Sequence, residues 1–250
     1  MFMDKNNDNK TLAAEVFGEN GFSLIKISDS DLDALEGLIS QQFQGRIKTL
    51  YPSLYGEFKS LPLDLYHEKA HLIDHKKSWP KVSRILPKSS VEKARALNFM
   101  KFLEGEVGAF QISDEERLGF ENIYWRLVRP DSFSDVGPLH ADEWFWALGH
   151  GRTPPNVKRI KVWIAINCER GKGGFRFLRG SHLKEWPYRG VMKDGIMKPE
   201  FDIPEESLGL EIFESGPGDG IVFNDKLLHG GIVGGSRTRV SIEFTMFVAK

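Results

Sequence analysis

The residues with the clearest potential for chemistry are His140, Asp142 and His229. The first two form a His-x-Asp pair, and alternate side chains of an extended strand point to the same face. An imidazole and a carboxylate at this spacing can hold one metal ion from the same side. His229 lies much later in the chain, so only a fold that brings distant strands together can add it as a third ligand.

Two histidines and one carboxylate are typical of non-haem Fe(II) oxygenases, whose metal keeps positions open for substrate and oxygen. Arg239 and Ser241 strengthen this interpretation, because a strand places them on one face and a guanidinium with a hydroxyl suits a carboxylate. The expected carboxylate is the distal one of 2-oxoglutarate, bound as cofactor. Alternatively, Arg239 pairs with Glu243 on its own strand, and Arg237 then becomes the candidate.

Trp144 and Trp146 continue the alternation of the His-x-Asp pair, so they either line a substrate pocket or fill the core. The segment Leu183–Ser207 fits neither a helical nor a strand period and is long for a bare connection. We expect it to be a functional loop or lid. A basic cluster that follows the His-x-Asp segment is expected to be a solvated loop: Arg152, Lys158, Arg159 and Lys161.

A second metal motif is present at His67-Glu68-x-x-His71, which matches the zinc peptidase pattern H-E-x-x-H. On a helix the two histidines would share a face with Glu68 as general base. However, Asp74 occupies the position of the glycine in the extended motif, and Lys77 that of its third histidine. A zinc-dependent hydrolase therefore stays as an alternative, and a non-catalytic jelly-roll binding module is another.

The elements that must position these residues change in period along the chain. The first part is mostly helical, with an opening strand at Gly21–Ile27 and helices at Asp31–Phe43, at Leu63–His75 and after a Ser89–Ser90 cap with Glu92. From residue 121 short strands alternate with glycine turns, which predicts a sandwich or closed barrel. The expected strands are Ile123–Arg129, Pro138–Leu148, Lys161–Asn167, Phe175–Leu178, Gly209–Glu214, Gly220–Phe223 and Arg239–Val248.

Composition narrows the class of protein. The 250 residues carry a net charge of −1, which argues against a dedicated nucleic-acid or membrane-surface binder. The single cysteine, Cys168, allows no intramolecular disulfide and no cysteine-based zinc cluster. With no signal-peptide pattern and no spanning apolar run, we expect a cytoplasmic protein with a small-molecule substrate. The oligomeric state is left open.

The second half of the chain resembles the phytanoyl-CoA dioxygenase family of Fe(II)/2-oxoglutarate-dependent dioxygenases. The residues that carry the resemblance are the His140-x-Asp142 pair, GGFRFLRGSH at 173–182, GPGDGIVFNDKLLH at 216–229 and Arg239-x-Ser241. It implies a single domain over 1–250, with a mostly helical part at 1–120 and a double-stranded β-helix, or jelly-roll, core at 121–250. The implied reaction is hydroxylation by O2, with 2-oxoglutarate converted to succinate and CO2. The substrate is not implied.

Overall fold

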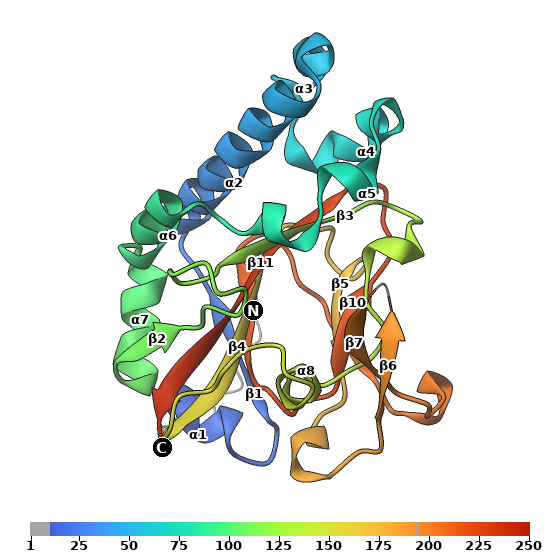
Figure 1. Cartoon of the computed structure of the whole chain (residues 1–250). Coiled ribbons are helices and arrows are strands. Elements are labelled where there is room, and N and C mark those ends of the chain that lie inside the picture. The colour runs from blue at the N-terminus through green and yellow to red at the C-terminus, as the bar shows by residue number, and fades with distance from the viewer. Residues whose placement is uncertain (1–10, 194) are drawn as a thin grey trace.

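A computed structural model describes residues 11–193 and 195–250, and its centre is one large antiparallel sheet (Figure 1). The strand order is β1–β9–β4–β11–β2, and β3 pairs with the first part of β11. The strands of this sheet are β1 (Phe22–Lys26), β2 (Phe110–Ile112), β3 (Tyr124–Val128), β4 (Val157–Asn167), β9 (Asp219–Asn224) and β11 (Arg239–Ala249).

A smaller sheet packs against one face of the large one. It has the order β10–β5–β8, formed by β10 (His229–Ile232), β5 (Gly174–Phe177) and β8 (Glu211–Phe213). Aromatic side chains of both sheets form one buried cluster, with Trp163 and Phe223 from the large sheet against Phe175 and Phe177 from the small one. Two facing antiparallel sheets with flanking helices confirm the expected mainly β, jelly-roll architecture.

The two long central strands place alternate side chains on opposite faces over most of their length. Ile160, Val162, Ile164 and Ile166 of β4 and the even-numbered residues of β11 join the larger apolar cluster beneath the helices. On the opposite face, Trp163 and Ala165 of β4 join the cluster shared with the small sheet, and Arg239 of β11 reaches Gly174 of β5. Since both faces of β4 are buried, its inward side chains are forced into the interior between the sheets.

Helices cover the outer face of the large sheet. The longest, α2 (Asp29–Leu50), runs past its predicted end at Phe43, because Ile47 extends the buried stripe for another turn. The remaining helices that flank the sheet are α1 (Leu12–Val16), α3 (Tyr55–Phe58), α4 (Tyr66–Lys69), α5 (His75–Ser78), α6 (Lys88–Arg95) and α7 (Asn98–Val107). None of the helices in the described ranges is long and apolar enough to cross a membrane.

The prediction of one helix over Leu63–His75 was wrong. The segment forms α4, short 3-10 turns at Leu63–Leu65 and Ala70–Leu72, and α5. Ile73 is extended, and the carboxylate of Asp74 accepts a hydrogen bond from the Lys77 amide, which starts a new helix. A local cap therefore overrides the apolar period here.

The helix expected after Ser89–Ser90 is interrupted. It begins at Lys88 without a side-chain cap and ends at Arg95, and α7 starts separately at Asn98. The buried carboxylate of Asp31, on α2, accepts hydrogen bonds from the amides of Asn98 and Phe99 at 3.2 and 2.9 Å. Asp31 thus caps α7 from another helix, an arrangement that sequence spacing could not show.

The strand expected at Pro138–Leu148 was also wrong, because His140 makes only an isolated bridge and Asp142–Ala147 form the short helix α8. Asp142 and Glu143 occupy its first turn, where acidic side chains are favoured. The segment expected as a lid contains a separate antiparallel hairpin, β6 (Arg189–Lys193) and β7 (Ile196–Glu200). Its role as a lid stays a prediction.

We expect Asp31→Ala to lower the free energy of unfolding by about 1–3 kcal/mol, because the two amides of α7 lose a buried acceptor. Urea denaturation of the full chain measures the effect. The matched control is Asp33→Ala, two residues along the same helix and exposed, which should change stability by less than about 0.5 kcal/mol. Equal effects of both substitutions would contradict the capping role.

Candidate metal centre

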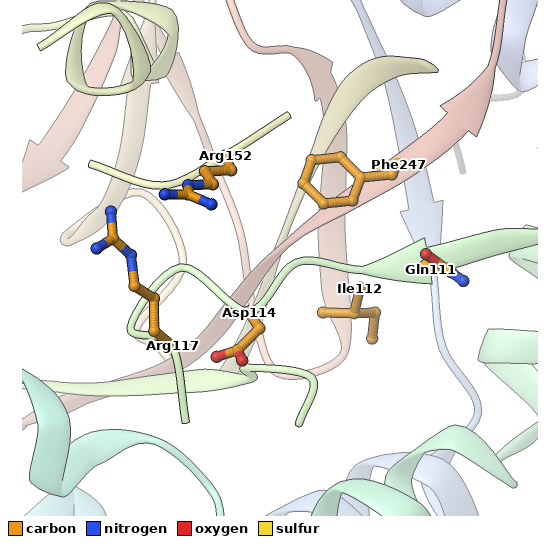
Figure 2. A pocket seen from close by; sticks show the side chains of 6 residues that line it. All are labelled: Gln111, Ile112, Asp114, Arg117, Arg152 and Phe247. Carbon is orange, nitrogen blue, oxygen red and sulfur yellow. The ribbon is translucent and has the colours of Figure 1, made fainter. Parts of the chain in front are cut away.

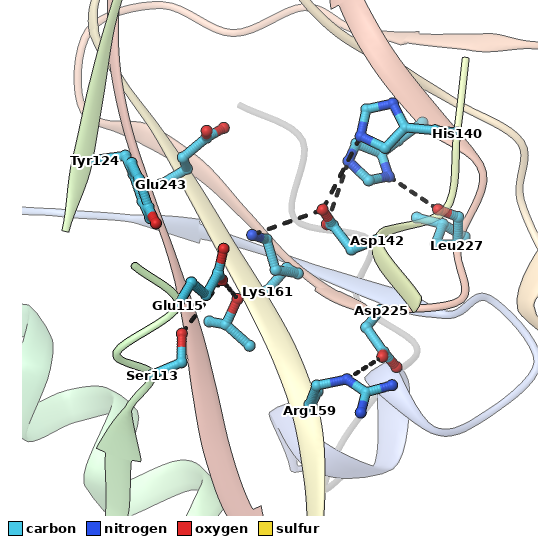
Figure 3. A network of polar contacts seen from close by, with 12 residues as sticks. Ser113, Glu115, Tyr124, His140, Asp142, Arg159, Lys161, Asp225, Leu227 and Glu243 are labelled. Atoms are coloured by element: carbon cyan, nitrogen blue, oxygen red, sulfur yellow. Dashed lines mark hydrogen bonds and ion pairs between the residues drawn. The ribbon is translucent and has the colours of Figure 1, made fainter. Parts of the chain in front are cut away.

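The structure brings His140, Asp142 and His229 together, and Figure 3 shows His140 beside Asp142. His140 and His229 form an isolated antiparallel bridge, with main-chain hydrogen bonds of 2.9 and 2.8 Å in the two directions. Asp142 is the first residue of α8. One ligand atom from each of the three side chains lies within 4.8 Å of the others.

Both imidazoles are fixed in the orientation that a metal ligand needs. The Nδ1 atom of His140 donates to the Pro138 carbonyl at 2.8 Å, and that of His229 donates to the Leu227 carbonyl at 2.9 Å. A carbonyl oxygen only accepts, so each ring carries its proton on Nδ1 and keeps a lone pair on Nε2. These Nε2 atoms lie 4.0 and 3.5 Å from the Asp142 carboxylate.

Asp142 presents one oxygen that nothing in the described structure satisfies. Its Oδ2 atom is buried without a hydrogen-bond partner, and Oδ1 lies 3.7 Å from the Lys161 ammonium. Burial alone would raise the pKa of Asp142, but Lys161 and the neighbouring imidazoles together hold it below its ordinary value. The carboxylate is therefore anionic at neutral pH and has an unused lone pair facing the two histidines.

His229 is enclosed by aromatic rings. Phe175 stacks on its imidazole with ring centroids 5.1 Å apart, and Phe223 contacts it at 4.7 Å. Burial, followed by the nearby His140, lowers the pKa of His229 to about 4. The ring is thus neutral at pH 7, which is the form that binds a metal.

These residues fit a divalent transition metal. Two neutral nitrogens and one carboxylate oxygen suit Fe(II) or a similar ion, and they leave further coordination positions free. A bound cation would supply the partner that the buried Oδ2 atom of Asp142 lacks. Within residues 11–193 and 195–250, the His, Cys, Asp and Glu side chains whose ligand atoms lie this close together are those of His140, Asp142 and His229.

Arg239 and Ser241 lie deeper between the sheets, on the inward face of β11. Arg239 donates to the Gly174 carbonyl at 2.6 Å and lies 5.7 Å from the Trp163 ring centroid, but its Nε atom has no partner. Burial lowers its pKa to about 10, so it stays cationic at neutral pH. Ser241 Oγ is also buried and unpartnered, so both residues have unused hydrogen-bonding capacity.

The alternative partners considered for this strand are occupied elsewhere. Glu243 pairs with Arg126 of β3, at 2.8 Å from Nε and 2.7 Å from Nη2, and not with Arg239. Arg237 is half exposed and pairs with Asp64, so it does not reach the interior.

The H-E-x-x-H residues do not share a helix. His67 belongs to α4 and His71 to the following 3-10 turn, and the His67 ring is hydrogen-bonded to Thr238 at 3.1 Å. The helical geometry that the zinc-hydrolase alternative requires is therefore not formed.

The same-face expectation for Trp144 and Trp146 was wrong, because they lie on a helix. Trp144 is buried and stacks on Tyr188 with centroids 4.7 Å apart, which anchors α8 to the segment before the hairpin. Trp146 instead contacts Phe247 at 5.8 Å and lies under the Arg159 guanidinium. Their assignment to substrate binding stays a prediction.

Sequence reasoning missed Lys161. It was expected to begin the strand Lys161–Asn167 and to belong to a solvated basic cluster, but β4 begins at Val157, and Lys161 is 7% exposed beside Asp142. Arg159 of the same cluster pairs with Asp225 at 2.5 Å. The signal that was available is parity, since Lys161 alternates with the buried Trp163.

A cavity of about 430 Å³ lies elsewhere, near the end of β11 (Figure 2). Its lining combines two exposed arginines with apolar side chains: Gln111, Ile112, Asp114, Arg117, Arg152 and Phe247. None of the metal-site residues lines this cavity, so the chemistry described above does not take place in it.

Comparison with known proteins agrees with this geometry. The profile of the family described as "Phytanoyl-CoA dioxygenase (PhyH)" matches residues 70–234, more than half of the chain. No curated protein matches the chain.

Several solved structures share the fold at low sequence identity. EvdO2 from Micromonospora carbonacea var. aurantiaca is 14% identical with a TM-score of 0.59, over 99% of this chain and 94% of that one. EctD from S. alaskensis, solved with 2-oxoglutarate and 5-hydroxyectoine, is 12% identical with a TM-score of 0.54, over 99% and 79%. SnoK, a non-haem α-ketoglutarate-dependent carbocyclase from nogalamycin biosynthesis, is 12% identical with a TM-score of 0.53, over 98% and 85%.

We expect Fe(II), added without oxygen, to raise the melting temperature of the metal-free chain, because an ion that binds only the folded state stabilises it. At a free concentration of 100 Kd the gain is about 2.7 kcal/mol. Asp142→Ala should abolish this shift, and His67→Ala, the control in the unused motif, should preserve it. Loss of the shift in His67→Ala alone would favour the hydrolase alternative.

Proposed function

The chain belongs to the phytanoyl-CoA dioxygenase family, and on that premise we propose that it is a non-haem Fe(II)- and 2-oxoglutarate-dependent oxygenase. The proposed reaction is hydroxylation of a small or medium-sized molecule by O2, with release of succinate and CO2. The observation that carries the proposal is the buried, unpartnered Oδ2 of Asp142, which faces two histidines whose Nε2 atoms are free.

In this proposal His140, Asp142 and His229 are the iron ligands. Bound iron would supply the activation of oxygen that the side chains cannot perform themselves. The side chains contribute position: two carbonyls orient the imidazoles, and Lys161 keeps Asp142 ionised. The aromatic rings around His229 keep water away from that side of the site.

Arg239 and Ser241 are the proposed binding residues for the distal carboxylate of 2-oxoglutarate. Their support is the unused capacity of Arg239 Nε and Ser241 Oγ, together with the positive charge of Arg239 in a buried position. Ring contacts lead from His229 through Phe175 and Trp163 to Arg239, so the proposed cosubstrate and metal subsites share one packed wall.

The test is titration of the metal-free protein with Fe(II) and 2-oxoglutarate under anaerobic conditions, followed by exposure to oxygen. We expect a weak visible metal-to-ligand absorption band and then succinate. Asp142→Ala should show neither. A wild-type protein without the band would defeat the proposal, whereas a band without any succinate would favour the non-catalytic binding module.

We further expect Arg239→Met to weaken 2-oxoglutarate binding by about tenfold to a hundredfold, since one charge-assisted interaction contributes about 1.5–3 kcal/mol. Fe(II) binding, measured by the thermal shift without 2-oxoglutarate, should stay near the wild-type value. Arg237→Met is the matched control, because that guanidinium is exposed. Unchanged 2-oxoglutarate affinity in Arg239→Met would remove Arg239 from the site.

A further inference from the structure

The wall beside the metal centre carries three charged side chains to which the proposed function assigns no ligand. The strand registers place Arg126 of β3, Lys161 of β4 and Glu243 of β11 on the same face of the large sheet, and we call them the ionic patch. Figure 3 shows Lys161 and Glu243 beside Asp142. In Figure 3 the Lys161 ammonium is joined to the Asp142 carboxylate, 3.7 Å away, and Glu243 stands on the neighbouring strand. The patch therefore borders the same space as the metal ligands.

The patch has unused hydrogen-bonding groups. Arg126 contacts only Oε1 of Glu243, and the described residues provide no hydrogen bond to Oε2. Lys161 has its ion pair with Asp142 at 3.7 Å but no hydrogen bond from the described part of the chain. Because the side chains of Arg126 and Glu243 are 36% and 20% exposed, a ligand can reach them.

Stability alone does not account for these charges. Taking an ion pair out of water costs free energy, and apolar side chains of similar size often replace such a pair without loss. The neighbouring inward positions, Trp163 and Ala165, show that this fold fills the same face with apolar residues. Charges that border the metal site and keep free donors and acceptors are better explained by a ligand.

The signs of the charges select the class of ligand. Lys161 also faces Glu115, but that carboxylate accepts hydrogen bonds from Ser113 and Thr245, and Asp142 is taken up by the metal in the proposed function. The groups left for a ligand therefore have opposite signs, which disfavours a purely anionic or purely cationic molecule. An aliphatic chain would displace water from all of them without replacing its hydrogen bonds. A small molecule with both charges satisfies the free Glu243 oxygen and the Lys161 ammonium together.

We propose that the ionic patch is the substrate-recognition surface, and that the substrate is a small zwitterion of the amino-acid type. Its ammonium group binds Glu243 and its carboxylate binds Lys161, next to the metal ligand Asp142. The inference rests on the proposed function, because it takes the space in front of the triad to be the substrate site.

The experiment uses the full chain loaded with Fe(II) and 2-oxoglutarate under anaerobic conditions. The probes are free amino acids, their N-acetyl and methyl ester forms, a neutral sugar and palmitoyl-CoA. We expect at least one free amino acid to perturb the visible band, with about tenfold weaker binding or worse after either end is blocked. Failure of every free amino acid, or equally tight binding of a blocked form, the sugar or the acyl-CoA, overturns the proposal.

Variants separate recognition from a structural role. Glu243→Gln should weaken amino-acid binding by about tenfold or more and leave 2-oxoglutarate affinity unchanged. The matched control is Glu211→Gln, which breaks a comparable arginine pair, with Arg179, on the exposed surface. The double variant Arg126→Gln, Glu243→Gln should recover any lost melting temperature but not the binding.

Each outcome points to one conclusion. Amino-acid binding that survives in Glu243→Gln, or that returns with stability in the double variant, refutes the recognition role. Absence of the visible band in the wild-type protein refutes the proposed function itself, before any probe is added.

Discussion

The parity of β4 and β11 is the constraint on which the rest of the structure depends. These strands pair along most of their length and are covered on both faces, so every second side chain must enter the space between the sheets. The side chains that face the helices are apolar from Ile160 of β4 and from Val240 of β11 onward, and they pack against those helices. The opposite face of the two strands carries the polar residues near the candidate centre: Lys161, Arg239, Ser241 and Glu243.

Polar groups in that position are costly unless each has a partner, and the structure shows which of them lack one. Arg126 and Glu243 satisfy each other in part, and Lys161 offsets the charge of Asp142. Asp142 Oδ2, Arg239 Nε and Ser241 Oγ remain without hydrogen bonds. Such atoms are rare in folded proteins and indicate where something else binds.

The amino-acid sequence was sufficient for the residues whose type is itself informative. The residue types singled out His140, Asp142 and His229, which the structure brings together, and the strand period placed Arg239 and Ser241 on one face. It was insufficient where tertiary contacts decide the local structure. The α8 helix depends on Asp225, whose carbonyl accepts from the Glu143 amide, and Lys161 reads as a surface residue until β4 is known to begin at Val157.

The bridge between His140 and His229 has a dynamic consequence. Because their amides and carbonyls bond reciprocally, the main chain holds the two residues opposite each other, and the side-chain contacts then orient the imidazoles. The smallest fluctuation that separates the rings is the opening of this one bridge, which would expose both amides to hydrogen exchange. An ion bound to both rings would oppose this opening. Slower hydrogen exchange at the amides of His140 and His229 would therefore report that the site is occupied.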